Sequence, residues 1–99
     1  MDAYWESGDR AALEVVASGR VQGVGFRQFT MQYARLYGVS GYVANQRDGS
    51  VRAYLVGSDT SVRQLLDAMR EGPVMARVDR LETTEVPLDA DYKSFVIRE

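Results

Sequence analysis

A turn near the middle of the chain constrains the fold more than any other feature of the sequence. Asp48-Gly49 separates two short strand-like runs, residues 41–47 and 50–57. Because Asp-Gly readily takes the positive φ angles that hairpin turns require, these runs are predicted to be neighbouring antiparallel strands. A segment with apolar residues at helical spacing lies on each side of them. The centre of the chain is therefore expected to run helix, strand, strand, helix.

Both helices have recognisable ends. The first is predicted to begin at Phe26 and to end at Gly38, a natural C-terminal cap. Its predicted apolar face consists of Phe26, Phe29, Tyr33, Leu36 and Tyr37. The second follows a cap within Ser58-Asp59-Thr60 and ends at Gly72-Pro73. Its predicted apolar face consists of Val62, Leu65, Leu66 and Met69.

Strands are expected outside the helices as well. Apolar and more polar positions alternate over residues 11–20, which places on one face Leu13, Val15 and Ala17. Residues 77–86 are predicted to form a more polar strand. Pro87 separates this strand from a last one at residues 92–98.

The order of these elements predicts the fold. Strand, helix, strand, strand, helix, strand is the split βαβ pattern (βαββαβ) of the α+β ferredoxin-like sandwich, here with a short extra C-terminal strand. Such a fold has a mainly antiparallel sheet with two helices on one face. RNA-binding, metal-binding and regulatory modules share this plan, so the function must be sought in particular residues.

The composition limits the chemistry. The 99 residues include no cysteine and no histidine, which excludes disulfides, thiolate chemistry and imidazole catalysis. The length is that of one domain. We expect this domain at residues 11–99, after a flexible acidic N-terminal tail, residues 1–10, whose Tyr4 and Trp5 are available to pack onto the domain. Any catalysis has to rely on arginine, carboxylates, amides, hydroxyls and the backbone.

The charge and hydropathy argue against two classes of binding partner. The formal net charge is −2, which argues against a general nucleic-acid or anionic-membrane surface. No apolar run approaches the ~20 residues of a membrane span, and the polar first ten residues do not resemble a signal peptide. We therefore expect a cytoplasmic protein that binds neither nucleic acid nor membranes. Nothing in the sequence suggests more than a monomer.

One stretch of the chain is cationic. No acidic residue lies between Glu14 and Asp48, and the glycine-rich residues 19–25 join a strand to a helix there. Backbone N–H groups of such a loop and of a helix start can converge on an anion. Arg27 lies in the first helical turn, where a cation is unfavourable by ~0.3–1 kcal/mol unless an anion binds. The alternative, a tight turn beside an exposed arginine, is about equally plausible on this evidence alone.

Asn45 is a second candidate. It lies near the end of a predicted strand, on the same face as Val43, although asparagine is uncommon in strands. Taken alone, it is better explained by a side-chain contact that starts the following turn.

These residues resemble the signature of the acylphosphatase family. The run Gly-Arg-Val-Gln-Gly-Val-Gly-Phe-Arg at residues 19–27 and the run Gly-Tyr-Val-Ala-Asn at residues 41–45 carry the resemblance, which extends over residues 11–98. It implies hydrolysis of small acyl phosphates to a carboxylate and inorganic phosphate, with no metal or other cofactor. It assigns phosphate binding to Arg27 and positioning of the attacking water to Asn45. The backbone cradle for the phosphate would be Gln22, Gly23, Val24, Gly25 and Phe26.

Three positions depart from the family pattern, and neither of the two implied catalytic residues is among them. Tyr42 stands where tryptophan is common, Gly25 where animal members have a bulkier residue, and Ala44 where a longer polar side chain is frequent. These departures bear on rate and substrate preference.

The implied reaction suits a chain without histidine. The leaving carboxylate has a conjugate acid with a pKa of about 4, so it needs no general acid. A phosphate oxygen of the substrate is the simplest acceptor for the proton of water, since nothing in the sequence places Glu14 or Asp48 against that water. Two alternatives stay open: a non-catalytic anion-binding regulatory module, and, more distantly, an RNA-binding module with Tyr54 as a stacking residue.

Overall fold

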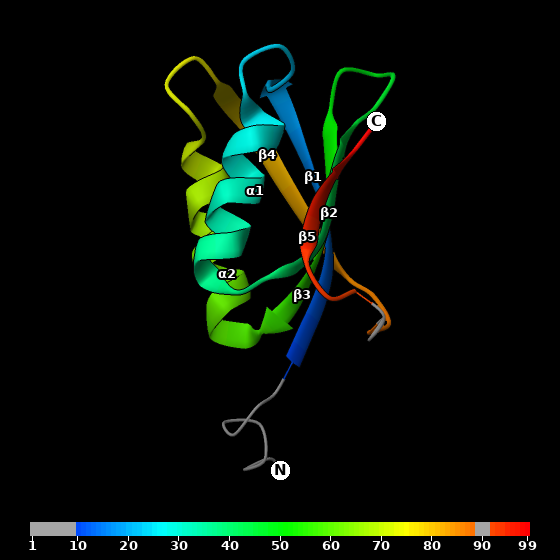
Figure 1. Ribbon diagram of the computed structural model, residues 1–99. Coiled ribbons are helices and arrows are strands. Elements are labelled where there is room, and N and C mark those ends of the chain that lie inside the picture. Colours follow the sequence, from blue (N-terminus) through cyan, green and yellow to red (C-terminus); the bar gives the residue numbers. More distant parts are fainter. Residues whose placement is uncertain (1–9, 89–91) are drawn as a thin grey trace.

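The computed structural model describes residues 10–88 and 92–99 and has the predicted ferredoxin-like architecture (Figure 1). The elements in chain order are β1 (Arg10–Arg20), α1 (Phe26–Tyr37), β2 (Ser40–Asn45), β3 (Val51–Ser58), α2 (Asp59–Glu71), β4 (Arg77–Glu85) and β5 (Phe95–Arg98). One five-stranded sheet has the strand order β4-β1-β3-β2-β5. All neighbouring strands are antiparallel except β2 and β5, which are parallel. Both helices cover the same face of the sheet.

The hairpin predicted from Asp48-Gly49 is confirmed. Gly49 has a φ of 95°, and the Gln46 N–H donates to the carbonyl of Ser50 over 2.9 Å. The Asp48 carboxylate accepts from the Ser50 N–H at 2.9 Å and from its hydroxyl at 2.6 Å. The turn occupies residues 46–50. As a result, β2 ends at Asn45, before the predicted residue 47, and β3 begins at Val51, after the predicted residue 50.

The hydrogen bonds from Ser50 lower the pKa of Asp48 below its ordinary value of 3.8. A lowered pKa in the folded state means that the ionised carboxylate stabilises folding above the unfolded-state pKa of about 3.9. This contribution is lost as the pH falls through the lowered value. We expect Asp48→Asn to unfold at a lower urea concentration than the parent at pH 7, with the difference shrinking below about pH 4. The exposed Asp67→Asn on α2 is the matched control, and a difference that grows in acid would contradict this assignment.

The core lies between the sheet and the two helices. On α2 the predicted apolar face is confirmed, with Val62, Leu65 and Met69 buried and Leu66 partly buried. The Ser58 hydroxyl caps this helix by accepting from the Ser61 N–H. The sheet contributes buried side chains that include Val15, Ala17, Val43, Ala53, Leu55 and Phe95.

The predicted apolar face of α1 is wrong at Leu36, which is 70% exposed. The stripe buried against the core is instead Phe26, Thr30 and Ala34. At about 100° per residue, Leu36 lies roughly 120° around the helix from the centre of that stripe. The small Thr30 and Ala34 are fully buried, and the Thr30 hydroxyl donates to the carbonyl of Phe26 at 2.9 Å. The prediction was based on the large apolar residues, whereas the small residues Thr30 and Ala34 are the ones that pack closely against the core.

Three segments meet at one end of the sheet. The loop at residues 21–25, the turn at residues 46–50 and the end of β5 all lie there, whereas β1 begins at the opposite end (Figure 1). The predicted N-terminal tail falls outside the described residues except for Arg10, the first residue of β1. Within the described part of the chain, neither helix combines the length and apolar character that crossing a membrane requires.

Candidate active site

The glycine-rich loop bends the chain from β1 into α1. Gly23 and Gly25 have φ angles of 74° and 82°, in the left-handed region that favours glycine. A Cβ at either position would meet no atom within 4 Å, so glycine is needed here for the backbone angle, and the space beside the loop is open. Val21 and Phe26 anchor the two ends of the loop with side chains that are 1% exposed.

The start of α1 suits an external anion. Gly25 occupies its N-cap position and can supply no side-chain acceptor, and the first turn contains no acidic residue. The first N–H groups of a helix lack partners within the helix and lie at the positive end of its dipole. Of the predicted loop residues, Phe26 has its ring in the core, so only its backbone can contact a ligand. The first N–H groups of α1 are therefore left without a side-chain cap, as at helix starts that bind anions.

Gln22 connects the loop to the hairpin turn. Its side-chain Nε2 donates to the carbonyl oxygens of Gln46 at 2.7 Å and Ser50 at 2.8 Å. The side-chain amide thus braces the loop, and the backbone of Gln22 is the part that remains for a ligand. Gln46 directly follows Asn45, so these bonds bring the loop beside the second candidate residue.

Arg27 extends from the first turn of α1 towards β5. Its Nη1 donates to the carbonyl oxygen of Arg98 through a long hydrogen bond of 3.4 Å. Arg98 is the register partner of Ala44 in β2, the residue before Asn45. The guanidinium of Arg27 therefore reaches the end of β2 at which Asn45 lies.

Asn45 is the last residue of β2, opposite Val51. Its Oδ1 is buried and has no hydrogen-bond partner among the described residues. A buried acceptor left unsatisfied costs about 1–3 kcal/mol, so its retention calls for an explanation. The side-chain contact within the turn comes from Asp48, which accepts from the Ser50 N–H. The turn-starting explanation of Asn45 thus loses its main support, and an open acceptor aimed at a ligand or a water accounts better for its position.

Two carboxylates considered as bases are already engaged. Glu14 accepts from Nη1 of Arg52 at 2.8 Å in an ion pair on the open face of the sheet. Asp48 is bonded to Ser50 as described above, and its lowered pKa makes it a weaker base. Each of the two carboxylates is therefore already paired with another side chain.

Sequence reasoning missed the role of Arg98. Its carbonyl oxygen receives the bond from Arg27, while its guanidinium lies 4.0 Å from the ring centroid of Tyr42 and donates to the Tyr92 hydroxyl at 2.8 Å. The cation–π contact fixes the end of β5 against the open face of the sheet. Arg98 and Tyr42 also line a hollow of about 640 Å³, to which Asn45 contributes but neither Arg27 nor the loop at residues 22–26 does. No local pattern reveals this arrangement, because it depends on the parallel pairing of β5 with β2.

One arginine of the cationic stretch has a structural partner. Arg35 also lies on α1, and its Nη2 donates to the carbonyl of Phe95 in β5 at 3.2 Å. This arginine holds the helix to the edge strand.

The comparison with protein families agrees with this geometry. The family model described as Acylphosphatase matches residues 13–97. The chain belongs to the acylphosphatase family. The match includes the loop, Arg27, Asn45 and all of β5 except its last residue.

Individual acylphosphatases are similar over most of their length. One from Methanocella arvoryzae is 44% identical over 87 residues, which cover 88% of this chain and 98% of that protein. One from Archaeoglobus fulgidus is 43% identical over 86 residues, covering 87% and 96%. The crystal structure of acylphosphatase from Bacillus subtilis superposes with a TM-score of 0.86 at 28% identity, covering 89% of this chain and 98% of that one. The chain is accordingly an enzyme that hydrolyses acyl phosphates, and the match supports this activity over a non-catalytic anion-binding module.

Proposed function

We propose that this acylphosphatase works through metal-independent attack of water, with the phosphoryl group held by residues 22–26 and Arg27 and the water held by Asn45. The observation that carries the proposal is the buried, unpartnered Oδ1 of Asn45 beside the strand end that Arg27 reaches. An acceptor without a partner next to an anion cradle is the arrangement that a bound water nucleophile requires.

The cradle and Arg27 provide the electrostatic part of catalysis. In phosphoryl transfer, the equatorial oxygens of the transferred group have to be held and their negative charge has to be offset. The attacking and leaving oxygens have to lie in line with phosphorus. Preorganised backbone N–H groups at the loop and helix start serve this purpose. The planar guanidinium of Arg27 can add two parallel hydrogen bonds to the same group.

Asn45 orients the nucleophile without acting as a base. Its amide does not titrate usefully, but Oδ1 can accept a hydrogen bond from a water and aim the oxygen lone pair at phosphorus. The water oxygen then bonds to phosphorus while the bond between phosphorus and the acyl oxygen breaks. The electron pair leaves with the carboxylate.

The proton of the water goes to a phosphate oxygen of the substrate in this proposal. The engagement of Glu14 with Arg52 and of Asp48 with Ser50 supports this substrate-assisted route. The products are then a carboxylate and protonated inorganic phosphate, and no protein group changes its charge. Because the leaving carboxylate is a weak base, no general acid is required.

We also propose that the enzyme is a cytoplasmic monomer that does not depend on nucleic acid or membranes, with its acylphosphatase-like domain at residues 11–99 after the N-terminal tail. The net charge of −2 supports this proposal. The exposed edge strand β4 supports it as well, because charged side chains oppose pairing between sheet edges. These side chains are Arg77, Asp79, Arg80, Glu82 and Glu85.

The test of the mechanism is the hydrolysis of a simple aryl acyl phosphate with EDTA present throughout. We expect EDTA to leave kcat unchanged and inorganic phosphate to inhibit competitively. A rate that EDTA abolishes and Mg²⁺ restores would overturn metal independence. No turnover by the folded protein, with phosphate still raising its Tm, would instead favour the non-catalytic anion-binding module.

A further inference from the structure

Gln22 links the two parts of the proposed active site, which come from different elements. It lies in the loop between β1 and α1, whereas Asn45 lies at the end of β2. The Nε2 of Gln22 donates to the carbonyl oxygens of Gln46 and Ser50, which are 24 and 28 residues away along the chain. Both hydrogens of this NH₂ group are therefore used in bonds to the hairpin turn.

The two acceptors belong to the residues that border the last pair of the ladder between β2 and β3. Gln46 directly follows Asn45, and Ser50 directly precedes Val51, the register partner of Asn45. The side chain of Gln22 thus contacts the chain at the end of both strands. The Oδ1 of Asn45 has no hydrogen-bond partner among the described residues, so the backbone of this pair has to hold it in place.

We propose that the side chain of Gln22 is a positioning group for the attacking water. By fixing the hairpin turn against the loop, it sets the distance between the phosphoryl group at the loop and the water at Asn45. This role rests on the proposed function, because it takes both of those placements from it. In-line attack depends on this distance, and a misplacement of about 1 Å can lower the rate about 10²-fold.

The chemistry of the contact calls for a primary amide. Two carbonyl oxygens accept and do not donate, so their common partner has to offer two N–H groups from one atom. Methionine has a similar length but no donor, and an ionised glutamate would face both oxygens with acceptors alone. The turn has bonds of its own, because the carbonyl of Ser50 also accepts from the Gln46 N–H at 2.9 Å and that of Gln46 from the Gly49 N–H at 3.2 Å. We therefore expect variants of Gln22 to fold.

Steady-state kinetics of the full-length protein on an aryl acyl phosphate test this role. Gln22→Met should lower kcat about 10–100-fold, while the inhibition constant of inorganic phosphate changes far less. Gln22→Glu should lower kcat further, because its carboxylate repels both carbonyl oxygens. A parental kcat in Gln22→Met would overturn the proposal. So would a loss of phosphate affinity that matches the loss of kcat, because the side chain would then shape the phosphate site itself.

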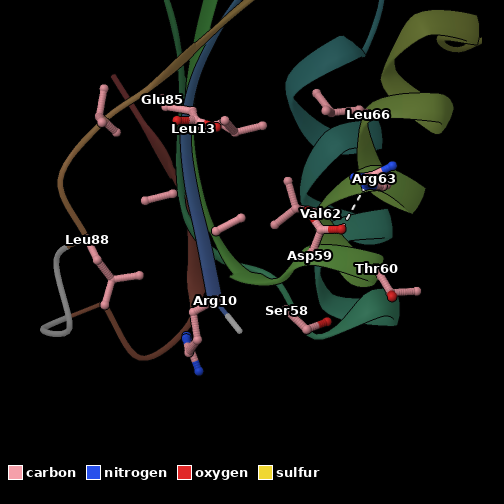
Figure 2. A pocket seen from close by; sticks show the side chains of 13 residues that line it. Arg10, Leu13, Ser58, Asp59, Thr60, Val62, Arg63, Leu66, Glu85 and Leu88 are labelled. Atoms are coloured by element: carbon pink, nitrogen blue, oxygen red, sulfur yellow. Dashed lines mark ion pairs between the residues drawn. The ribbon is translucent and has the colours of Figure 1, made fainter. Parts of the chain in front are cut away.

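The control variants lie on α2. Gln64→Met and Gln64→Glu repeat the same two substitutions at an exposed glutamine. Asp59→Asn breaks a side-chain tie elsewhere, the ion pair with Arg63 at 2.8 Å, which lines the hollow between β1, α2 and β4 (Figure 2). Because β3 runs from Val51 beside the turn to Ser58 before α2, this pair lies at the opposite end of the sheet. All three variants should keep the parental kcat and phosphate inhibition.

A double-mutant cycle with Asn45→Ala separates positioning from a merely structural role. Once Asn45 no longer holds the water, adding Gln22→Met should lower kcat by no more than about twofold. A structural role predicts instead that the two losses multiply. Multiplied losses would overturn this inference and leave the proposed function intact, whereas a parental kcat of Asn45→Ala alone would overturn both.

Discussion

Arg27→Ala is expected to lower kcat/KM by at least about 10²–10³-fold and to weaken inhibition by inorganic phosphate. Loss of one preorganised oxyanion donor already costs this much, and a charged, bidentate donor contributes at least as much. The loss should appear in both kcat and phosphate affinity, because the guanidinium is proposed to contact the phosphoryl group before and during transfer. Steady-state kinetics on an aryl acyl phosphate, with phosphate as product inhibitor, measure both effects.

The same substitution should leave folding stability unchanged or slightly higher. Arg27 makes one long hydrogen bond to the carbonyl of Arg98, and a cation in the first turn of a helix is unfavourable by ~0.3–1 kcal/mol. Activity lost without stability lost separates a binding role from a structural one. Arg27→Lys keeps the charge without the planar fork and should fall between the parent and Arg27→Ala. Arg63→Ala, on the exposed side of α2, is the control, and near-normal activity of Arg27→Ala would remove Arg27 from the site.

The parts of the fold that the sequence predicted rest on local signals. The Asp48-Gly49 turn needs a positive φ, the Ser58 cap needs a neighbouring N–H, and glycine at position 38 has a φ of 75° at the end of α1. Each of these signals acts within a few residues of the chain. Together they specify the order of the elements, and that order leaves few possible topologies.

The parts that could not be predicted depend on contacts between distant residues. The rotation of α1 about its axis is set by the fit of Thr30 and Ala34 against the sheet, which a count of apolar residues does not record. Likewise, Gln22 reaches the turn 24 and 28 residues away, and Arg27 reaches a carbonyl 71 residues away. The candidate residues could be named from the motif, but the supports that hold them could not.

These supports explain how a small site can be rigid in a chain that has no disulfide. The loop is tied to the hairpin through Gln22, and β5 is tied to α1 through Arg35 and to the open face of the sheet through Arg98. Each contact joins a candidate catalytic segment to an element of the sheet or helix layer. Catalytic groups have to be held within a fraction of an ångström, and packing against regular elements achieves this better than loops alone.

Asn45→Ala is expected to lower kcat by about 10²-fold or more while changing the inhibition constant of phosphate far less. The amide oxygen is proposed to contact the water and not the phosphoryl group, so its removal leaves the cradle and Arg27 in place. Loss of alignment of a reacting group typically costs on the order of 10² in rate. Measuring kcat and phosphate inhibition on the same preparation separates the two effects.

Stability provides the independent check on Asn45. Its buried Oδ1 has no partner and destabilises the fold by about 1–3 kcal/mol, a cost that a bound water would reduce. Asn45→Ala should therefore be as stable as the parent or more stable. A residue that costs stability and is needed for rate is typical of an active site. Two results would contradict this role. A loss of phosphate affinity with kcat unchanged would make Asn45 a binding residue, and a fall in Tm matching the fall in activity would make it part of the turn.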